Sequence, residues 1–441
     1  MRLFVCLDGE VAGTLEMRGS TVRFAYSEAW LADKGAYPVS QAWPIQPTGI
    51  TGSVVTNFLW GLLPDNERTL DAWARRFQVS ARNPVALLSH VGEDCAGAVQ
   101  FVREDRLDEV QAAADAPPQI EWLDDAQLER RIQHLAQDTS AARESATEGQ
   151  FSLSGAQAKT ALYFDKRHRR WGVPQGRTPT THILKPVTNE FDAFDLNEHF
   201  CLMLARRVGL AAASTECRVI GGVPTLIAER YDRIRREGRW LRIHQEDCCQ
   251  ALGIHPGSKY EHQGGPGFAQ IMTLLEGTDE PEADRERFMR SACLVYLIAA
   301  TDAHAKNFSL LYGRGGERYS MRLAPLYDIA SAWPYPKQLP VQKMKLAMRI
   351  GRHYRWREIQ PRHFTELARS CRFSPATLLA ILTELATRLP DEASALIGKL
   401  HQTKITGDML SGLLDGLTTH CRNVTSQLET LAGALVGNGP P

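Results

Sequence analysis

The sequence has no excess of either charge, no long apolar run and no paired cysteine motif. Lysine plus arginine and aspartate plus glutamate number 51 each, so the chain has no bulk charge with which to bind nucleic acid, although a local basic patch would still allow contact. The 9 cysteines are scattered, odd in number and without a CxxC pair, which argues against a disulfide framework and against a zinc site. We therefore expect reduced thiols.

The chain also lacks the patterns of secretion and of membrane insertion. Arg2 is followed by only a handful of apolar residues before Asp8, too few for the apolar core of a signal peptide. Residues 294–300 form an apolar run that is too short to cross a bilayer and has the length of a buried element. We expect a soluble, cytoplasmic protein with no membrane contact, and its 441 residues predict two or three structural units.

One short motif carries the strongest chemical signal. Asp302 is followed five positions later by Asn307, and Asp328 lies twenty-one residues beyond Asn307. Protein kinases present a catalytic base and two magnesium ligands in this order. A short loop would direct Asp302 at a hydroxyl proton, while Asn307 and Asp328 would hold the metal at the phosphates.

This spacing alone is weak support, because Asp and Asn five positions apart occur by chance in many chains. The surroundings favour the chemical interpretation. The run 294–300 would position the loop, and Asp328 stands in the otherwise apolar stretch 323–330, where a carboxylate usually has a cation, a helix terminus or a hydrogen-bond donor as partner. His304, within the loop, is also compatible with an ordinary surface or core histidine.

The N-terminal part is predicted to be a small α+β unit. Asp8 and Gly9 supply the positive φ angles of a tight turn, so residues 3–15 predict a β-hairpin. A helix is expected over 65–77. Residues 103–120, charged and then rich in alanine and proline, are typical of a linker.

Strands dominate from residue 151 onward. Strands over 151–153 and 160–164 would flank a turn of small residues, 154–159, whose backbone N–H groups can bind phosphate. An ordinary hairpin turn is the commoner interpretation of such a segment. A strand over 181–186 would present Lys185 at its end, where kinases reach the α- and β-phosphates.

Helices dominate the rest of the chain. Asp195 or Glu198, at the start of a helix over 197–210, would pair with Lys185 or act as a solvated acid at the helix N-terminus. After a strand over 223–228 we predict helical segments over 245–253, 266–276, 284–300 and 362–435.

These motifs together resemble the HipA family of kinases, the toxin half of HipBA type II toxin–antitoxin pairs. The resemblance spans most of the chain and rests on seven ordered motifs, at residues 62–67, 91–98, 154–160, 179–185, 244–247, 301–309 and 327–328. It implies an α+β, bilobal protein-kinase-like fold with an N-terminal α+β subdomain and a mainly helical C-terminal lobe. The implied parts are the N-terminal subdomain (1–105), a linker and helix (106–150), the remainder of the N-lobe (151–235) and the C-lobe (236–441).

The resemblance further implies an ATP- and Mg²⁺-dependent serine/threonine protein kinase. Asp302 would be the catalytic base, and Asn307 and Asp328 the metal ligands. Residues 229–231 would meet the adenine as a hinge. The nucleotide would contact Ser154, Gly155, Ala156, Gln157, Ala158, Lys159, Lys185, Glu229, Arg230, Tyr231, His304, Ala305, Lys306, Asn307, Tyr327 and Asp328.

In this family a serine at the start of the phosphate loop is autophosphorylated, which expels the loop and switches the kinase off. Alignment on Gly155 makes that serine Ser152, and Ser154 is the rival. A phosphoserine would compete with ATP for the same N–H groups and for Lys185. Ala158 departs from the glutamate that is common in relatives, but neither the mechanism nor the metal needs that glutamate.

Partners follow from the same resemblance. A HipB-like helix-turn-helix antitoxin would bind this chain and read operator DNA, and the substrate would be a translation-related protein such as an aminoacyl-tRNA synthetase. The segment 337–362 is either solvated surface or a contact for DNA phosphates, since it contains Lys337, Lys343, Lys345, Arg349, Arg352, Arg355, Arg357 and Arg362, with Tyr354 and Trp356 between them. The alternatives are a corepressor or binding module held on DNA by the antitoxin, and a small-molecule or lipid phosphotransferase.

Overall fold

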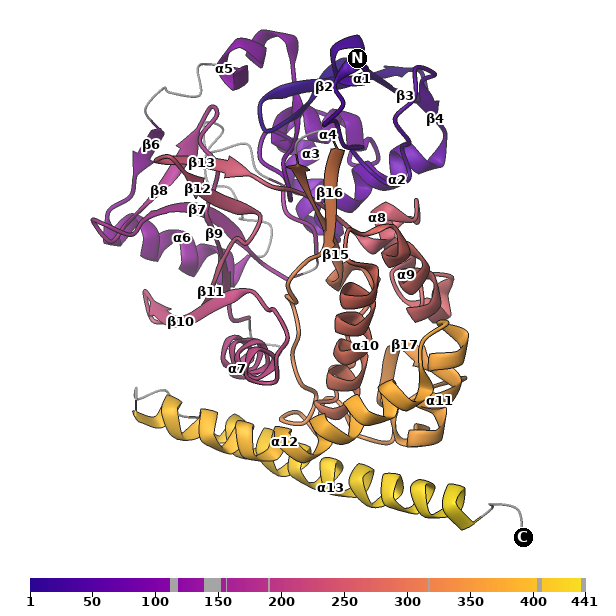
Figure 1. Cartoon of the computed structure of the whole chain (residues 1–441). Helices are drawn as coiled ribbons and strands as arrows, with labels where there is room; N and C mark the ends of the chain where they lie inside the picture. The colour runs from indigo at the N-terminus through magenta and orange to yellow at the C-terminus, as the bar shows by residue number, and fades with distance from the viewer. Residues whose placement is uncertain are drawn as a thin grey trace. The chain divides into compact units, whose positions relative to one another are not determined.

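The structure is a computed structural model, and it describes residues 1–111, 118–138, 152–155, 157–188, 191–315, 318–402 and 407–437. The chain folds into two compact units, whose elements are labelled in Figure 1. Unit 1 consists of Met1–Thr188, Ser214–Ser258 and Ser309–Ala324, and unit 2 of Asn189–Ala213, Lys259–Phe308 and Pro325–Pro441. The four consecutive parts expected from the sequence stay a prediction.

Unit 1 begins with a five-stranded sheet in the order β4-β3-β2-β1-β5. Its strands are β1 (Arg2–Leu7), β2 (Glu10–Arg18), β3 (Thr21–Tyr26), β4 (Ile50–Thr51) and β5 (Val99–Val102). The predicted hairpin is confirmed, because β1 pairs antiparallel with β2 through a turn in which Asp8 has φ 50° and Gly9 has φ 86°. Both angles are the positive values that such a turn requires.

Four helices accompany this sheet: α1 (Glu28–Ala32), α2 (Ser53–Leu62), α3 (Glu67–Phe77) and α4 (Pro84–Val91). The helix predicted over 65–77 is confirmed, with its start at Glu67. The Asn66 side chain accepts a hydrogen bond from the Arg68 N–H, and such a cap sets where a helix begins.

The linker expected over 103–120 is wrong for most of its described residues. They form η1 (Glu104–Arg106), α5 (Leu107–Gln111) and the start of β6 (Gln119–Trp122). Val110 is buried against Cys6 and Val102, so this stretch belongs to the core despite its charged composition. Residues 112–117 lie outside the described part of the chain.

A second sheet of unit 1 has the order β10-β11-β9-β7-β8-β6. It adds β7 (Thr160–Asp165), β8 (Arg170–Gln175), β9 (His182–Pro186), β10 (Ser214–Ile220) and β11 (Val223–Glu229). Helix α6 (Asp125–Gln137) contributes Leu128 and Ile132 to a core with Leu162, Leu184 and Ile227. The strands predicted over 160–164, 181–186 and 223–228 are confirmed.

Two predictions for unit 1 need correction. Residues 152–154 form no strand, and Phe151 lies outside the described residues. The helix expected over 245–253 is reduced to α8 (Cys248–Ala251), because the preceding residues form β14 (His244–Asp247). That strand pairs antiparallel with β15 (Ser309–Gly315), which also pairs with β16 (Arg318–Leu323). A strand whose partner lies more than sixty residues away cannot be recognised from the local spacing of apolar residues.

The remaining hairpin of unit 1 is β12 (Arg233–Arg236) with β13 (Arg239–Arg242), and η2 spans Pro256–Ser258.

Unit 2 is mainly helical. Its helices are α7 (Phe194–Arg207), α9 (Phe268–Leu274), α10 (Pro281–Leu297), α11 (Pro361–Ser370), α12 (Pro375–Gln402) and α13 (Asp408–Gly437), with a small hairpin of β17 (Lys345–Ile350) and β18 (His353–Arg355). Short 3-10 turns are η3 (Glu261–Gln263), η4 (Leu275–Gly277), η5 (Ala305–Asn307) and η6 (Trp356–Glu358). Helix α12 packs against α7, α10, α11 and α13, and Figure 1 shows α12 and α13 side by side. The helices predicted for this half of the chain, apart from 245–253, are confirmed.

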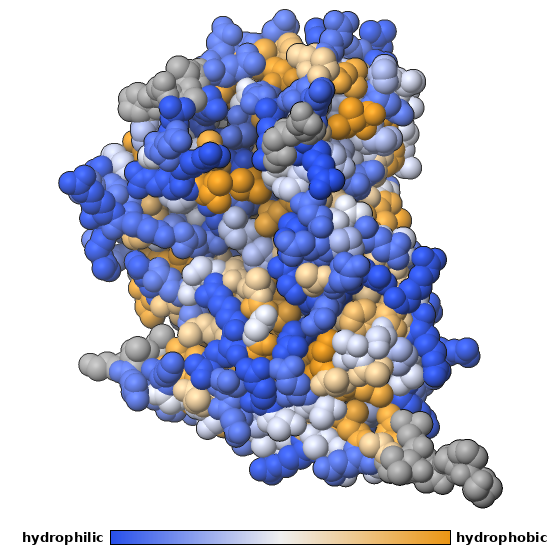
Figure 2. Space-filling model, viewed as in Figure 1, coloured by the Kyte–Doolittle hydropathy of each residue, from blue (hydrophilic) through white to orange (hydrophobic). Residues whose placement is uncertain are grey.

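The surface agrees with a protein whose apolar residues are mostly internal. Hydrophilic residues predominate on the face shown in Figure 2, and hydrophobic residues form separate patches there. In the described part of the chain, no helix has the length and apolar character needed to cross a bilayer.

Candidate active site

The loop that carries Asp302 follows the buried end of α10. Residues 292–300 are all buried, so the buried element predicted to position the loop is confirmed. Asp302 itself is exposed. Its Oδ1 atom accepts a hydrogen bond from the Tyr260 hydroxyl at 2.5 Å. Within the loop, the His304 N–H donates to the Asp302 main-chain oxygen at 2.8 Å, which tightens the turn.

Asn307 and Asp328 come together although twenty-one residues separate them. The Asn307 Nδ2 donates to the main-chain oxygen of Asp328 at 2.8 Å, and the Tyr327 hydroxyl donates to the Lys306 main-chain oxygen at 2.6 Å. Asp328 has φ 58°, a backbone conformation that is uncommon outside glycine. The two proposed metal ligands therefore lie in one locally fixed structure within unit 2.

The segment after Asp328 is anchored to α7 and α10. Asn197 in α7 accepts a hydrogen bond from the Ser331 N–H at 2.9 Å and donates to the Ser331 oxygen at 2.8 Å. The Ser331 hydroxyl donates to the Ile298 oxygen at 2.7 Å. These buried bonds hold the Asp328 segment to the helix that precedes the Asp302 loop.

His304 is buried in the centre of this loop. Burial lowers the pKa of its imidazole to about 4, although the nearby charge of Asp302 opposes the shift, so the ring is neutral near pH 7. Its ring lies edge-on to that of Tyr260, with centroids 5.2 Å apart. Its Nδ1 atom is buried and has no hydrogen-bond partner among the residues described. The interpretation of His304 as an ordinary surface residue is therefore wrong.

The phosphate-loop segment is docked onto the N-terminal part of unit 1. Ser152 is fully buried; its N–H donates to the Asp94 oxygen at 3.0 Å and its hydroxyl to the Leu62 oxygen at 2.8 Å. Gly155, with φ 103°, forms a bridge to Pro64. The Asp65 N–H donates to the Gly155 oxygen at 3.2 Å. The segment is thus a docked loop that leads into β7, and the expected turn between two strands is wrong.

The other loop residues lie close by. The Lys159 Nζ donates to the Ser154 oxygen at 2.7 Å. Ala158 is buried against Leu135, and Gln157 is half-buried. Ala156 lies outside the described residues.

Lys185 occupies the position predicted for it, in β9 opposite Leu226 of β11, and it is buried. Asp195 and Glu198 belong to α7 in unit 2, and both are buried. The interpretation of either as a solvated acid is therefore wrong, while a pairing with Lys185 stays a prediction.

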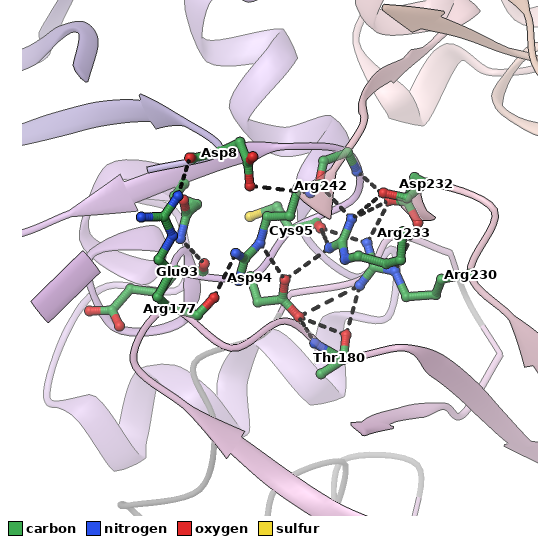
Figure 3. A network of polar contacts seen from close by, with 12 residues as sticks. Asp8, Glu93, Asp94, Cys95, Arg177, Thr180, Arg230, Asp232, Arg233 and Arg242 are labelled. Carbon is green, nitrogen blue, oxygen red and sulfur yellow. Dashed lines mark hydrogen bonds and ion pairs between the residues drawn. The ribbon is translucent and has the colours of Figure 1, made fainter. Parts of the chain in front are cut away.

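The three expected hinge residues, 229–231, differ in their contacts and burial. Glu229 ends β11 and forms an ion pair with Lys166 at 2.7 Å. Arg230 is buried, its N–H donates to the Thr181 oxygen at 2.9 Å, and its own oxygen accepts from the Arg233 N–H at 3.3 Å. Burial raises the pKa of the Tyr231 hydroxyl. The Arg230 side chain belongs to a polar network inside unit 1 (Figure 3). Its guanidinium group therefore binds other residues of the protein interior.

Sequence reasoning missed four residues that organise these segments. Asp94 lies in a motif that carries the family resemblance, but it had no assigned role. Asn197 lies in the predicted helix over 197–210, but neither that pattern nor the surroundings of Tyr260 and Ser331 indicates their roles, because these depend on partners far away in the chain.

Two family models match this chain. The HipA N-terminal domain matches residues 3–102, and the HipA-like C-terminal domain matches residues 151–393, which is more than half of the chain. Fold and loop geometry thus define an α+β protein with a kinase-like architecture. The chain belongs to the HipA family.

Named relatives agree with this assignment. The chain is 37% identical over 353 residues to "Putative kinase Y4mE" of Sinorhizobium fredii, covering 79% of this chain and 81% of the relative. It is 28% identical over 402 residues to "Serine/threonine-protein kinase toxin HipA" of Shewanella oneidensis, covering 87% of each.

A solved structure shows the same fold. It is described as the Shewanella oneidensis toxin–antitoxin system HipA, HipB and its operator DNA complex. The match has a TM-score of 0.80 at 24% identity, and it covers 97% of this chain and 98% of the other. The predicted α+β, kinase-like HipA fold is confirmed.

Proposed function

We propose that this chain is an ATP-dependent serine/threonine protein kinase and the toxin of a type II toxin–antitoxin system. The observation that carries the proposal is the hydrogen bond joining Asn307 to Asp328, in the same unit and loop region as the exposed carboxylate of Asp302. The relatives named as kinases support it.

In this proposal Asp302 is the catalytic base. As the acceptor hydroxyl oxygen bonds to the γ-phosphorus of ATP and the bond to the β-phosphate oxygen breaks, Asp302 takes the hydroxyl proton. The Tyr260 hydroxyl already binds Oδ1, which leaves Oδ2 to receive that proton.

Asn307 and Asp328 fit a magnesium site. Because the Asn307 Nδ2 donates to the Asp328 main-chain oxygen, its Oδ1 is the amide atom that remains for a metal. An amide oxygen and a carboxylate are the hard ligands that Mg²⁺ prefers. When bound there with ATP, the ion supplies charge neutralisation at the phosphates. The neutral ring of His304 would lie beside the same phosphates, with its buried Nδ1 as the polar atom.

Unit 1 would supply the remaining nucleotide contacts. Lys185 would bind the α- and β-phosphates, and the backbone N–H groups of residues 154–159 would bind phosphate oxygens. The main chain around Glu229 and Tyr231 would meet the adenine.

The test is transfer of radiolabelled phosphate from ATP with the wild type, with Asp302→Ala and with Asp391→Ala. Asp391 is an exposed aspartate in α12 of unit 2 and serves as the matched control. Loss of the base is expected to lower transfer at least about 100-fold, while the control stays at the wild-type rate. Equal incorporation by all three proteins would refute the assignment of Asp302.

We also propose that Ser152 is autophosphorylated. Its hydroxyl is buried and donates to the Leu62 oxygen, so a phosphate with up to two negative charges has no room at that position and would keep the loop out of place. Mass spectrometry of protein expressed with intact catalytic residues is expected to find phosphate on Ser152 and none in the Asp302→Ala protein. Phosphate confined to Ser154 would contradict this assignment.

The proposed partner is a HipB-like helix-turn-helix antitoxin that reads operator bases, as the HipA, HipB and operator complex of Shewanella oneidensis suggests. The proposed substrate is a translation-related protein such as an aminoacyl-tRNA synthetase, by family analogy.

The second candidate function is a corepressor held on DNA, and the observation that favours it is the exposed basic segment 337–362. A small-molecule or lipid phosphotransferase is the weakest alternative, and label on a metabolite in place of protein would reveal it.

A further inference from the structure

A buried cluster of five charged side chains lies inside unit 1 (Figure 3). Asp94, Arg230, Asp232, Arg233 and Arg242 each expose no more than 9% of their side chains. Burying charge in this way is unfavourable unless each group is paired and hydrogen-bonded. The cluster is therefore either a structural brace or a device that positions something else.

Asp94 lies at the centre of the cluster. Its Oδ1 accepts from Arg233 at 2.8 Å and from Arg242 at 3.2 Å. Its Oδ2 accepts from the Thr180 N–H at 3.1 Å and from the Thr180 hydroxyl at 2.6 Å. Burial by itself would raise the pKa of Asp94, but the charges of Arg233, Arg242 and Arg230 outweigh it and hold the pKa below its ordinary value. The carboxylate is thus ionised and held by four hydrogen bonds.

The cluster reaches the proposed hinge segment after β11 through Arg230 and Asp232. Arg230 donates to Asp232 at 2.7 Å, to the Thr180 hydroxyl at 2.9 Å and to the Cys95 oxygen at 2.8 Å. The Gly97 N–H donates to Asp232 at 2.7 Å, and a Cβ added to Gly97 would lie 2.4 Å from the Gln245 nitrogen. Main-chain groups of Cys95 and Gly97, next to Asp94, are therefore bound by the side chains of Arg230 and Asp232 after β11, and Gly97 also lies close to the main chain of β14.

The same residue also holds the phosphate loop. The Asp94 main-chain oxygen accepts from the Ser152 N–H, while Leu62 and Asp65 bind the Ser152 hydroxyl and the Gly155 oxygen. Asp94, Leu62 and Asp65 lie in the region that matches the HipA N-terminal domain, whereas Ser152 and Gly155 lie in the region that matches the C-terminal domain. The loop is thus held in place by the other domain of the family.

We propose that Asp94 is a positioning residue for the nucleotide. Through its main-chain oxygen it places the start of the phosphate loop, and through its carboxylate it places Thr180, two residues before β9 and its Lys185. The N-terminal subdomain is then a clamp that presents two phosphate-binding groups, the loop and the lysine, in fixed positions. The inference rests on the proposed function, because it concerns how ATP is bound.

The test compares Asp94→Asn and Thr180→Val with Glu93→Gln. Glu93 is the adjacent buried carboxylate, and it binds Arg106 at 3.0 Å through both oxygens, away from the loop, so it controls for the loss of a buried charge. Binding of Mg·ATP by titration calorimetry, kcat and KM are measured for each protein. Hydrogen exchange of peptides covering 152–155 provides a readout that does not depend on activity.

Asp94→Asn removes the negative charge and replaces one of the two accepting oxygens by an NH2 group that faces other donors. It is therefore expected to raise the dissociation constant and KM for ATP about tenfold, with kcat nearly unchanged. Thr180→Val removes the hydroxyl that donates to Asp94 and accepts from Arg230, so it should raise both constants about fivefold. Thr180→Ser should restore them. Exchange at 152–155 should become faster in Asp94→Asn and in Thr180→Val, because both change the contacts of the residue whose main-chain oxygen binds the Ser152 N–H. It should stay at the wild-type rate in Glu93→Gln.

The outcomes distinguish a positioning role of Asp94 from a purely structural role of the charged cluster. If Asp94→Asn and Thr180→Val lower thermal stability but leave ATP affinity and exchange at 152–155 unchanged, the cluster is only a brace and the inference is wrong. Should Asp94→Asn fail to fold, Thr180→Val decides. If the wild type binds no ATP, the proposed function fails, and exchange at 152–155 alone then shows whether Asp94 positions the loop.

Discussion

Tyr260 is the side chain that most directly constrains the proposed base. Its hydroxyl donates to Asp302, and its ring contacts that of the buried His304. The backbone beside it is also tied to the loop, since the Lys259 oxygen accepts from the Ala305 N–H at 3.4 Å. One short segment therefore orients the exposed carboxylate of Asp302.

Removing only the hydroxyl tests this role. We predict that Tyr260→Phe lowers kcat about tenfold, because a hydrogen bond to a charged group is removed while the ring stays in place. KM for ATP should stay at the wild-type value, since no proposed nucleotide ligand changes. Steady-state kinetics measure both, and Tyr354→Phe, on the neighbouring hairpin, is the control. An unchanged kcat would show that Asp302 needs no such support.

Glu246 is a buried carboxylic acid whose surroundings change its protonation. It lies buried in β14, where Oε1 accepts from the Gln41 N–H at 2.8 Å and from the Tyr312 hydroxyl. Burial raises the pKa of this carboxyl to about 7. Because the folded pKa lies above the unfolded one, the folded state binds the extra proton, and stability is lost as pH rises from about 4.5 towards 7.

We predict that Glu246→Gln, which mimics the protonated acid, stabilises the protein increasingly with pH. The gain in unfolding free energy relative to the wild type should grow by about 2 kcal/mol between pH 5 and pH 8. Denaturant titrations at several pH values measure it. A gain that does not change with pH would mean that Glu246 titrates normally, and Glu216→Gln, on the half-buried strand β10, is the control.

At the scale of elements, the hairpin of β17 and β18 carries the largest concentration of basic residues singled out by the sequence. The eight lysine and arginine residues of segment 337–362 are all exposed. Three of them are engaged locally: Arg349 pairs with Glu261 at 2.9 Å, Arg355 with Glu358 at 3.3 Å, and Arg362 donates to His363 at 3.2 Å. An exposed basic surface is compatible with both interpretations of the segment, solvated surface and DNA contact.

The salt dependence of DNA binding separates those interpretations. We predict that replacing Lys343, Lys345 and Arg352 with glutamine weakens binding of the chain and its antitoxin to operator DNA. The slope of log affinity against log salt should fall by about one for each substituted side chain that neutralises a DNA phosphate in the wild type. The control replaces three exposed arginines of the hairpin of β12 and β13 with glutamine, namely Arg235, Arg236 and Arg239. Equal slopes in all proteins would assign segment 337–362 to solvated surface.

The helices and strands also show which elements can be predicted from local sequence patterns and which cannot. The turn at Asp8 and Gly9 and the periodic helices of unit 2 could be predicted because their determinants lie within a few residues of one another. The strand β14 could not, because its partner β15 begins at Ser309 and its own residues favour a helix equally well. The linker expected over 103–120 failed for a similar reason, since only packing against the N-terminal sheet buries Val110.

At the scale of the whole molecule, the two units divide the proposed machinery. Unit 2 contains the base and both metal ligands, and unit 1 contains Lys185, the phosphate loop and the charged cluster around Asp94. The family models cut the chain differently, at residues 3–102 and 151–393. The N-terminal region is thus part of the same compact unit as the phosphate loop and is no separate appendage of the kinase-like part.

The sequence by itself determined the family and many of the helices and strands, and it suggested the chemistry of the proposed site, because Asp302, Asn307 and Asp328 are recognised by residue type and spacing. Only the tertiary structure decided that Ser152 is buried against Leu62 and Asp94, that Tyr260 holds Asp302, and that five charges pair inside unit 1. Spacing along a chain reports local geometry, whereas burial and pairing depend on which distant segments meet, and many different sequences satisfy those requirements equally well.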